Sequence, residues 1–327
     1  MLQVILLILA LGQIGASPAG PEIIRDSSYT GLVPLCDLGL MTYKGQDGGL
    51  YGNGQNSPPG PLQAVAWQQA QLIQTLDTYG RPSEDGKIGL ISLGMSNTTQ
   101  EFTTFKKIAD LDPDKSPSVV IVDCAQGGQD AYAWAHPEPN ADRTPWLVMD
   151  RRLEQAGLSA AQVQVVWIKQ ALKNPAALGP FPKHAQVLRD DLVVILQVLK
   201  ARFPNLRIAY LSSRIYAGYA TTALNPEPYA YESAFAIRWL IDAQWQGDPD
   251  LNWDPDVGPV MVPLLLWGPY LWADGINGRK DGLVWLREDF GPDGTHPSES
   301  GRLKVAQMLL AFFKQDPSAR CWFVGNP

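Results

Sequence analysis

The sequence contains few of the residues that bind metal ions, form disulfides or contact nucleic acid. Only three histidines and three cysteines occur among its 327 residues, and the cysteines show no C-x-x-C spacing. We therefore expect no bound metal ion. Asp and Glu (33) outnumber Lys and Arg (26), so the net charge is −7, and no basic stripe with interleaved aromatic residues is present. Nucleic acid is therefore not an expected partner.

The cysteine count also limits the disulfides that can be expected. In an exported protein, three cysteines allow one bridge and leave one thiol over. Cys124 ends an apolar, strand-like run, so we expect it to be buried and unpaired. The expected pair is therefore Cys36 with Cys321.

Long hydrophobic runs are absent except at the start of the chain. The stretch "MLQVILLILALGQIGASPAG" is apolar from Leu2 to Leu11 apart from Gln3, and small residues follow it. It is short for a membrane helix and is typical of a secretory signal peptide. We predict a signal peptide over residues 1–19 and a secreted, periplasmic or extracellular chain with no stable membrane span after processing. Because no Lys or Arg precedes the apolar run, an N-terminal anchor or a misassigned start remains an alternative.

Residues 20–327 show no linker, repeat or low-complexity tract and are predicted to form one domain. Runs rich in Val and Ile alternate with stretches of helical periodicity. This alternation predicts an α/β fold, a doubly wound, mostly parallel five-stranded sheet with helices on both faces. The segment 225–258, rich in Pro, Trp and Asp, is a candidate inserted cap. The predicted strands are 87–93, 118–124, 163–168, 207–213 and 259–267, and the predicted helices are 62–78, 184–203, 229–245 and 299–315.

Polar and small residues follow the predicted strands at their carboxyl ends, where doubly wound sheets bind ligands. The first strand runs into "GMSN" (94–97), the second into "AQGGQ" (125–129) and the third into "KQ" (169–170). The motif "DGTHPS" (293–298) precedes the last helix. A serine, paired glycines, an aspartate and a histidine are the components of an acyl-transfer site: nucleophile, backbone N–H donors, orienting carboxylate and base.

Each of these residues also has a structural explanation. A serine after a strand is most often a helix N-cap, paired glycines most often form a turn, and Ser298 is expected to cap the final helix. Their joint order along the chain favours the catalytic interpretation. An α/β-hydrolase does not fit, because Thr98 stands where its G-x-S-x-G motif requires the second glycine.

On these motifs the sequence resembles the SGNH (GDSL-type) hydrolase family over roughly residues 87–315. "LGMSNT" stands at the first block, with Ser96 as the nucleophile and Met95 where the family usually has Asp. "CAQGGQDA" matches the second block and implies that Gly128 donates its N–H to an oxyanion. "DGTHPS" matches the last block and implies Asp293 and His296. The third block, usually Gly-x-Asn-Asp, is absent, and "VVWIKQAL" stands in its place.

The resemblance implies a flavodoxin-like SGNH fold and ester hydrolysis through an acyl-enzyme without a cofactor. Ser96 would attack the ester carbonyl, His296 would take and return its proton, and Asp293 would orient the imidazole. The other histidines, His136 and His184, lie in Pro-flanked polar surroundings and are predicted to be surface or capping residues.

An oxyanion hole would use the backbone N–H groups of Ser96 and Gly128, and a third donor is needed to replace the missing Asn. Gln170 or Lys169 could supply it, and strand alternation sends these two side chains to opposite faces. Gln170 is favoured slightly, because its amide is a neutral donor like that of Asn. In the alternative, Lys169 pairs with Asp123 and Gln170 merely begins a helix.

The substrate is predicted from aromatic and amide side chains. Eleven tryptophans occur, and four of them follow residue 250: Trp253, Trp267, Trp272 and Trp285. The loop 48–61 is rich in Gly, Pro and Asn, and loops of that length are often functional. We predict an exported serine esterase acting on an O-acyl or O-acetyl carbohydrate, with Asn97, Asn53 and Trp272 contacting the substrate. The alternative is a non-catalytic carbohydrate-binding or cell-surface protein on the same scaffold, which the missing third block favours.

Overall fold

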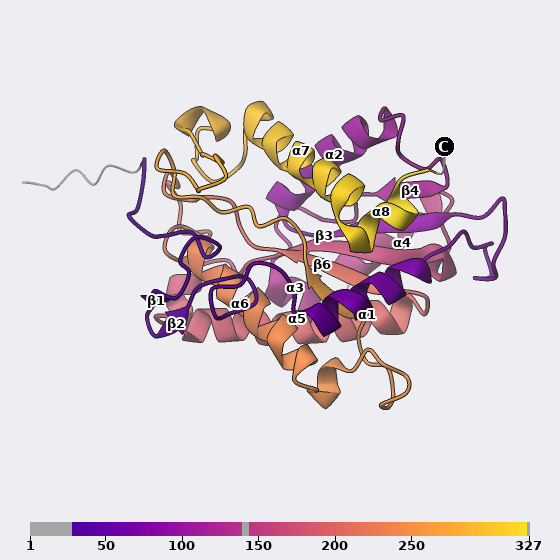
Figure 1. Cartoon of the computed structure of the whole chain (residues 1–327). Coiled ribbons are helices and arrows are strands. Elements are labelled where there is room, and N and C mark those ends of the chain that lie inside the picture. The colour runs from indigo at the N-terminus through magenta and orange to yellow at the C-terminus, as the bar shows by residue number, and fades with distance from the viewer. Residues whose placement is uncertain (1–27, 139–143, 326–327) are drawn as a thin grey trace, which may run out of the picture.

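The structure, a computed structural model, describes residues 28–138 and 144–325. The predicted signal peptide over residues 1–19 lies outside the described residues. At the centre is a five-stranded parallel sheet with the strand order β4-β3-β5-β6-β7 (Figure 1). This is the predicted α/β fold. The strands are β3 (Ile88–Gly94), β4 (Val119–Val122), β5 (Val163–Lys169), β6 (Ile208–Ser212) and β7 (Leu264–Trp267).

Helices cover both faces of the sheet, which explains why its strands read as continuous apolar runs. All seven residues of β3 and all seven of β5 are buried. On one face α2 (Ser96–Asp110) packs against α7 (Glu299–Gln315), and on the other α5 (Lys183–Arg202) packs against α6 (Tyr229–Trp245) (Figure 1). The shorter helices are α1 (Gly60–Gln71), α3 (Ala131–Ala135), α4 (Pro145–Gln155) and α8 (Pro317–Phe323), with 3₁₀ turns at Ala160–Gln162, Pro175–Leu178, Pro249–Leu251 and Arg287–Asp289.

The order of the strands creates a topological switch point beside β3. After β3 the chain adds β4 on one side of that strand, and then adds β5 on its other side. The connection from the carboxyl end of β3 therefore leads to one side and that from β5 to the other. The position between two such strands is where open α/β sheets bind ligands. The residues that follow β3 and β5 lie at this point.

The predicted elements agree with the structure in most places. The helices over 229–245 and 299–315 have the predicted bounds, and α5 is shifted by one residue. Helix α1 and strands β4, β6 and β7 are shorter than predicted. Helix α1 ends at Gln71, because the chain then turns so that Leu76 can bridge to Lys87. Strand β7 begins only at Leu264, directly after Pro263, which has no N–H to give to a ladder.

The segment 225–258, the candidate inserted cap, consists mainly of a helix and the connection that follows it. Residues 229–245 form α6, an ordinary crossover helix packed on α5, β6 and β7. The chain from 246 onward leads to the start of β7 and so lies at the amino edge of the sheet, opposite the carboxyl ends. The three tryptophans of this segment, Trp239, Trp245 and Trp253, are partly buried and pack against the core.

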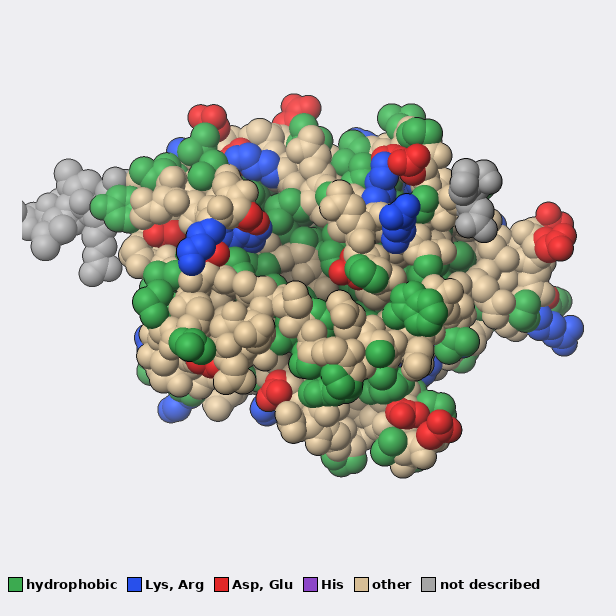
Figure 2. Space-filling view, in the orientation of Figure 1, with side chains coloured by type: hydrophobic (Ala, Val, Ile, Leu, Met, Phe, Trp, Pro, Cys, Tyr) green, Lys and Arg blue, Asp and Glu red, His purple; other side chains and the backbone are tan. Residues whose placement is uncertain are grey.

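The disulfide prediction is wrong, because Cys36, Cys124 and Cys321 are all free thiols. Cys124 is fully buried, as expected of a small apolar residue at the end of a strand. No helix within residues 28–138 and 144–325 is long and apolar enough to cross a membrane. The face in Figure 2 shows Lys and Arg interspersed with Asp and Glu rather than gathered into a basic stripe.

Upstream of α1, the chain forms a small hairpin and then the Gly-, Pro- and Asn-rich loop. The hairpin strands are β1 (Thr42–Tyr43) and β2 (Gln46–Asp47). Leu50 in the loop accepts a hydrogen bond from the Trp267 indole at the end of β7. Tyr51 and Asn56 line a small cavity with Asp316, where α7 passes into α8. The loop is therefore packed along the β7 side of the domain.

Candidate active site

Ser96 is the first residue of α2 and stands at the switch point, directly beyond β3. A glycine precedes the turn because β3 and β5 approach closely there: a Cβ on Gly94 would lie 2.4 Å from the carbonyl oxygen of Lys169. Met95 is extended and provides no side-chain cap. The first N–H groups of α2 are therefore not capped, and the positive end of the helix dipole is directed at the position of Ser96.

Ser96, His296 and Asp293 form a continuous hydrogen-bonded chain. Ser96 Oγ lies 2.7 Å from His296 Nε2, and His296 Nδ1 lies 2.6 Å from Asp293 Oδ2. The serine comes from α2 and the other two residues from the loop before α7, two hundred positions away in sequence. The His296 and Asp293 side chains keep 31% and 34% of their surface exposed. Solvent and a substrate can therefore reach the three groups.

The Asp293 carboxylate is held in its ionised form by several donors. Its Oδ1 accepts the backbone N–H groups of Thr295 and His296, each at 3.0 Å, while Oδ2 faces the imidazole. Partial burial opposes ionisation, but these hydrogen bonds outweigh it and hold the pKa of Asp293 below its usual value. An ionised carboxylate at Nδ1 fixes the imidazole tautomer that leaves Nε2 free to accept the serine proton.

Two backbone N–H groups beside Ser96 are unused. Within the described residues, the N–H groups of Ser96 and Gly128 donate to no other protein group. A Cβ on neighbouring Gly127 would lie 3.8 Å from the Ser96 Cβ, so this loop runs alongside the serine. Gly128 has φ +77° and nothing within 4 Å of its Cβ position, so it borders open space. The two N–H groups could serve as oxyanion donors.

Gln170 is buried and engaged with the backbone at both ends of its amide. Its Nε2 donates to the carbonyl of Gln129 at 3.3 Å, and its Oε1 accepts the N–H of Ala171 at 3.2 Å. Nearby, Lys173 Nζ donates to the carbonyl of Gly128 at 3.1 Å. The structure therefore brings Gln170 to the glycine loop as a support for it, which differs from the predicted role as a donor to the oxyanion.

Lys169 forms a structural ion pair, as in the alternative prediction, but its partner is Glu101 and not Asp123. Lys169 Nζ lies 2.6 Å from Glu101 Oε1, one and a half turns along α2 from Ser96, and both side chains have 0% exposure. Burial lowers the pKa of Lys169 to about 8 and raises that of Glu101. The ammonium is directed into the protein beneath α2 and is not available as an oxyanion donor. Asp123 instead bonds Ser92 Oγ at 2.6 Å, and burial raises its pKa to about 6.

The three predicted substrate contacts do not gather around Ser96. Asn97 is 1% exposed and donates to the carbonyl of Thr295, inside the protein. Trp272 is 0% exposed, and its indole donates to Glu227 Oε1 at 2.7 Å. Asn53 is exposed on the loop beside β7, where its backbone N–H bonds the Asp47 carboxylate. Their positions correct the predicted carbohydrate-binding set.

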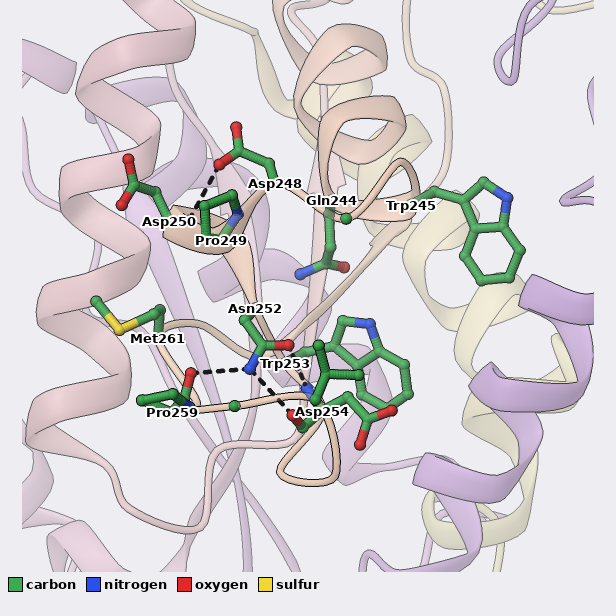
Figure 3. A pocket seen from close by; sticks show the side chains of 13 residues that line it. Gln244, Trp245, Asp248, Pro249, Asp250, Asn252, Trp253, Asp254, Pro259 and Met261 are labelled. Atoms are coloured by element: carbon green, nitrogen blue, oxygen red, sulfur yellow. Dashed lines mark hydrogen bonds between the residues drawn. The ribbon is translucent and has the colours of Figure 1, made fainter.

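The remaining predicted aromatic contacts are likewise structural or remote. Trp267 and Trp285 are buried. Trp253 lines a cavity of about 500 Å³ between the end of α6 and the start of β7 (Figure 3). Because β7 begins at the amino edge, this cavity lies on the side of the sheet opposite Ser96. In it, the Asn252 amide is already bonded to the carbonyls of Asp254 and Pro259.

The other two histidines have different surroundings. His136 ends α3 and is about half exposed, with Nε2 3.0 Å from Asp191. His184 was predicted to be a surface or capping residue. It is not at the surface, because it is 3% exposed in the first turn of α5, with Nε2 2.6 Å from Glu232 Oε2. Glu232 also accepts hydrogen bonds from Tyr43 and Lys44, so His184 belongs to a cluster that ties the hairpin to α6. Among the described residues, no group of three or more His, Cys, Asp or Glu could hold a metal ion.

No pattern in the sequence indicated which groups support the site. Glu101 belongs to no motif, and Thr295 lies within the DGTHPS motif but was given no role. Thr221, which donates its N–H to the Asp293 carbonyl at 3.0 Å, lies in the loop after β6. Each was found only through its contacts.

Neither the protein-family models nor the curated proteins contain a match to this sequence. Comparison with solved structures gives distant likenesses. A presumed acylhydrolase from Bacteroides fragilis is 14% identical, with a TM-score of 0.38 over 78% of this chain and 96% of the other. A carbohydrate acetylesterase from Xanthomonas citri is 9% identical, with a TM-score of 0.37 over 70% and 56%.

A salicylyl-acyltransferase from a tetracycline biosynthetic pathway is 13% identical, with a TM-score of 0.35 over 73% of this chain and 58% of the other. This chain thus spans little more than half the length of the acetylesterase and the acyltransferase. Likenesses at these scores do not transfer an activity, so function is argued below from the geometry around Ser96.

Proposed function

We propose that this protein is a serine hydrolase of the SGNH type that cleaves an ester through an acyl-enzyme. The observation that carries the proposal is the hydrogen-bonded chain from Ser96 Oγ through His296 to the ionised Asp293. Its position at the switch point, beyond the carboxyl end of β3, adds independent support, because ligands of such sheets bind there.

The reaction follows from these groups. Ser96 Oγ attacks the ester carbonyl carbon while its proton passes to His296 Nε2, and the carbonyl oxygen becomes an oxyanion. The free N–H groups of Ser96 and Gly128 lie where they could stabilise that charge. The imidazolium, stabilised by Asp293, then protonates the leaving alcohol as the C–O bond breaks. In the second half, a water attacks the acyl-serine, His296 takes its proton, and the acid and free serine are released.

We propose an ester as the substrate and assign no particular alcohol to it. Trp272, Asn53 and Asn97, on which the carbohydrate prediction rested, are buried or remote. An O-acyl sugar therefore stays a sequence-based hypothesis. Export likewise rests on the sequence of residues 1–19 alone.

A non-catalytic role on the same scaffold is the second candidate, and the site geometry favours the enzyme over it. A site that had lost its catalytic activity would not need a serine hydroxyl 2.7 Å from an imidazole that is itself oriented by a carboxylate. The third-block Asn that the sequence lacks remains the feature in favour of the non-catalytic role.

Turnover of p-nitrophenyl acetate separates the two candidates. We expect the wild-type protein to release p-nitrophenol above the rate in buffer, and Ser96→Ala to reduce kcat by about 10⁴-fold or more. Ser213→Ala is the matched control, because Ser213 is a buried serine whose hydroxyl has no partner in the structure. It should keep wild-type kcat. Equal rates for wild type and Ser96→Ala would favour the non-catalytic role.

A further inference from the structure

Asn97 joins the helix that carries Ser96 to the loop that carries His296. Its side chain is 1% exposed, and Nδ2 donates to the Thr295 carbonyl oxygen at 2.9 Å. Asn97 follows Ser96 directly, and Thr295 directly precedes His296. The amide bond therefore connects the immediate neighbours of the two groups between which a proton must move.

Two parallel hydrogen bonds thus cross between the same two segments. One is Ser96 Oγ to His296 Nε2 at 2.7 Å, and the other is Asn97 Nδ2 to the Thr295 carbonyl. Within the described residues these are the hydrogen bonds that link α2 to the loop 293–297. A single bond would fix a distance and leave the loop free to pivot. Two bonds at adjacent positions also fix the orientation of the loop relative to α2.

The remaining restraints on the histidine loop come from other parts of the chain. Thr221 donates to the Asp293 carbonyl, and Gly291 donates to the His296 carbonyl at 2.8 Å. These contacts shape the loop and tie it to the segment after β6. Packing of α7, which follows the loop, on α2 also restrains the loop. Among the described residues, the Asn97 amide provides the hydrogen bond, besides that of Ser96, which joins the loop directly to α2.

We propose that Asn97 is a positioning residue that keeps His296 in register with Ser96 throughout the reaction, an inference that rests on the proposed function. When Ser96 Oγ becomes bonded to the acyl carbon, its hydrogen bond to His296 is lost. The Asn97–Thr295 bond involves no reacting atom and persists. His296 therefore stays within reach of the leaving alcohol, and later of the attacking water.

The hydrogen bond from position 97 to the Thr295 carbonyl requires a side chain that donates, as an amide does. Thr295 is 3% exposed, so its carbonyl cannot readily exchange Asn97 for bulk water. An aspartate would have nearly the shape of asparagine but would place a second acceptor against the carbonyl oxygen. Asn97→Asp therefore preserves volume and removes the donor, whereas Asn97→Ala removes both.

A matched control exists at the opposite edge of the sheet. Asn205, in the turn before β6, donates its Nδ2 to the carbonyl of Ala161 at 2.8 Å. Ala161 precedes β5, so this bond joins two segments at the amino ends of their strands. Asn205→Ala removes the same kind of bond, an asparagine amide to a backbone carbonyl distant in sequence, away from Ser96.

The experiment measures kcat and KM on p-nitrophenyl acetate, together with Tm, for Asn97→Ala, Asn97→Asp, Asn205→Ala and Ser96→Ala. We expect both Asn97 variants to lose about 10²-fold in kcat with KM little changed, as for misplacement of a catalytic group. Asn205→Ala should lower Tm comparably and keep kcat within about twofold of wild type, as substitutions remote from a site usually do.

The outcomes separate this inference from the proposed function. If wild type turns over and Ser96→Ala does not, but Asn97→Asp keeps full kcat, the positioning role is wrong and the proposed function stands. A loss of kcat in Asn205→Ala equal to that in Asn97→Ala would also overturn the positioning role, since general destabilisation would then explain both. Absence of turnover in the wild type would instead overturn the proposed function.

Discussion

The ends of β3 and β5 are neighbours in the sheet and have opposite characters. Beyond β3, Ser96 is partly exposed, its hydroxyl faces His296, and its backbone N–H is free. At the end of β5, Lys169 and Gln170 are 1% and 3% exposed and bonded internally. One strand end therefore presents reacting groups, while the next carries groups that hold the surroundings in place.

This difference suggests how the site functions without the Asn that its third block lacks. Lys169 bonds Glu101 on the nucleophile helix, and Gln170 bonds the loop that contains Gly128. The two side chains bond different segments, and each supports a different component of the site. The oxyanion would then depend on two backbone N–H groups in a rigid frame.

Breaking the Lys169–Glu101 pair should produce the largest effect on this frame. Lys169→Met leaves the Glu101 carboxyl buried without a partner, and we expect the free energy of unfolding to fall by about 3–5 kcal/mol. Urea denaturation measures it. Lys106→Met is the control on the same helix, because its pair with Asp110 is about 40% exposed; it should cost about 1 kcal/mol or less.

A second variant sharpens the test of the buried pair. The double substitution Lys169→Met with Glu101→Leu removes both charges and should recover most of the lost stability, since apolar pairs often replace buried ion pairs without penalty. If Lys169→Met is no more destabilising than Lys106→Met, the buried pair does not hold α2 as inferred.

Gln170→Ala should have a smaller effect, on kcat rather than on stability. Loosening the loop that contains Gly128 should lower kcat by about tenfold with KM little changed, less than the 10²-fold typical of losing a direct oxyanion donor. Gln164→Ala is the control at the other end of β5, where its amide bonds the backbone of Gln74. It should leave kcat unchanged. A 10²–10³-fold loss in Gln170→Ala would instead identify Gln170 as the third donor.

Much of the fold follows from the sequence because it depends on local patterns. Runs rich in Val and Ile gave all five strands of the central sheet, and the apolar periodicity gave α5, α6 and α7 almost to the residue. Ser298 caps α7 as its position before an apolar helix indicated. The residues of the candidate triad were found because their spacing and placement at strand ends are also local features.

The partners of buried polar residues could not be found in this way. The alternative prediction paired Lys169 with Asp123, but the face that a side chain occupies decides its partner, and that partner is Glu101 on α2. Trp272 was assigned to the substrate because tryptophan suits a sugar ring, yet burial beside Glu227 determines its role. Such contacts join residues far apart in the chain and leave no pattern in the sequence.

The most direct test of the central claim is the site of covalent modification by a serine-directed fluorophosphonate. The probe is added to the whole protein, and peptide mass spectrometry locates the adduct. The contrast between β3 and β5 predicts one adduct, on the peptide containing Ser96, and none in Ser96→Ala. Among the described residues, the Ser96 hydroxyl is the one that contacts a base oriented by a carboxylate. Equal labelling of Ser96→Ala, or an adduct on another residue, would contradict the claim.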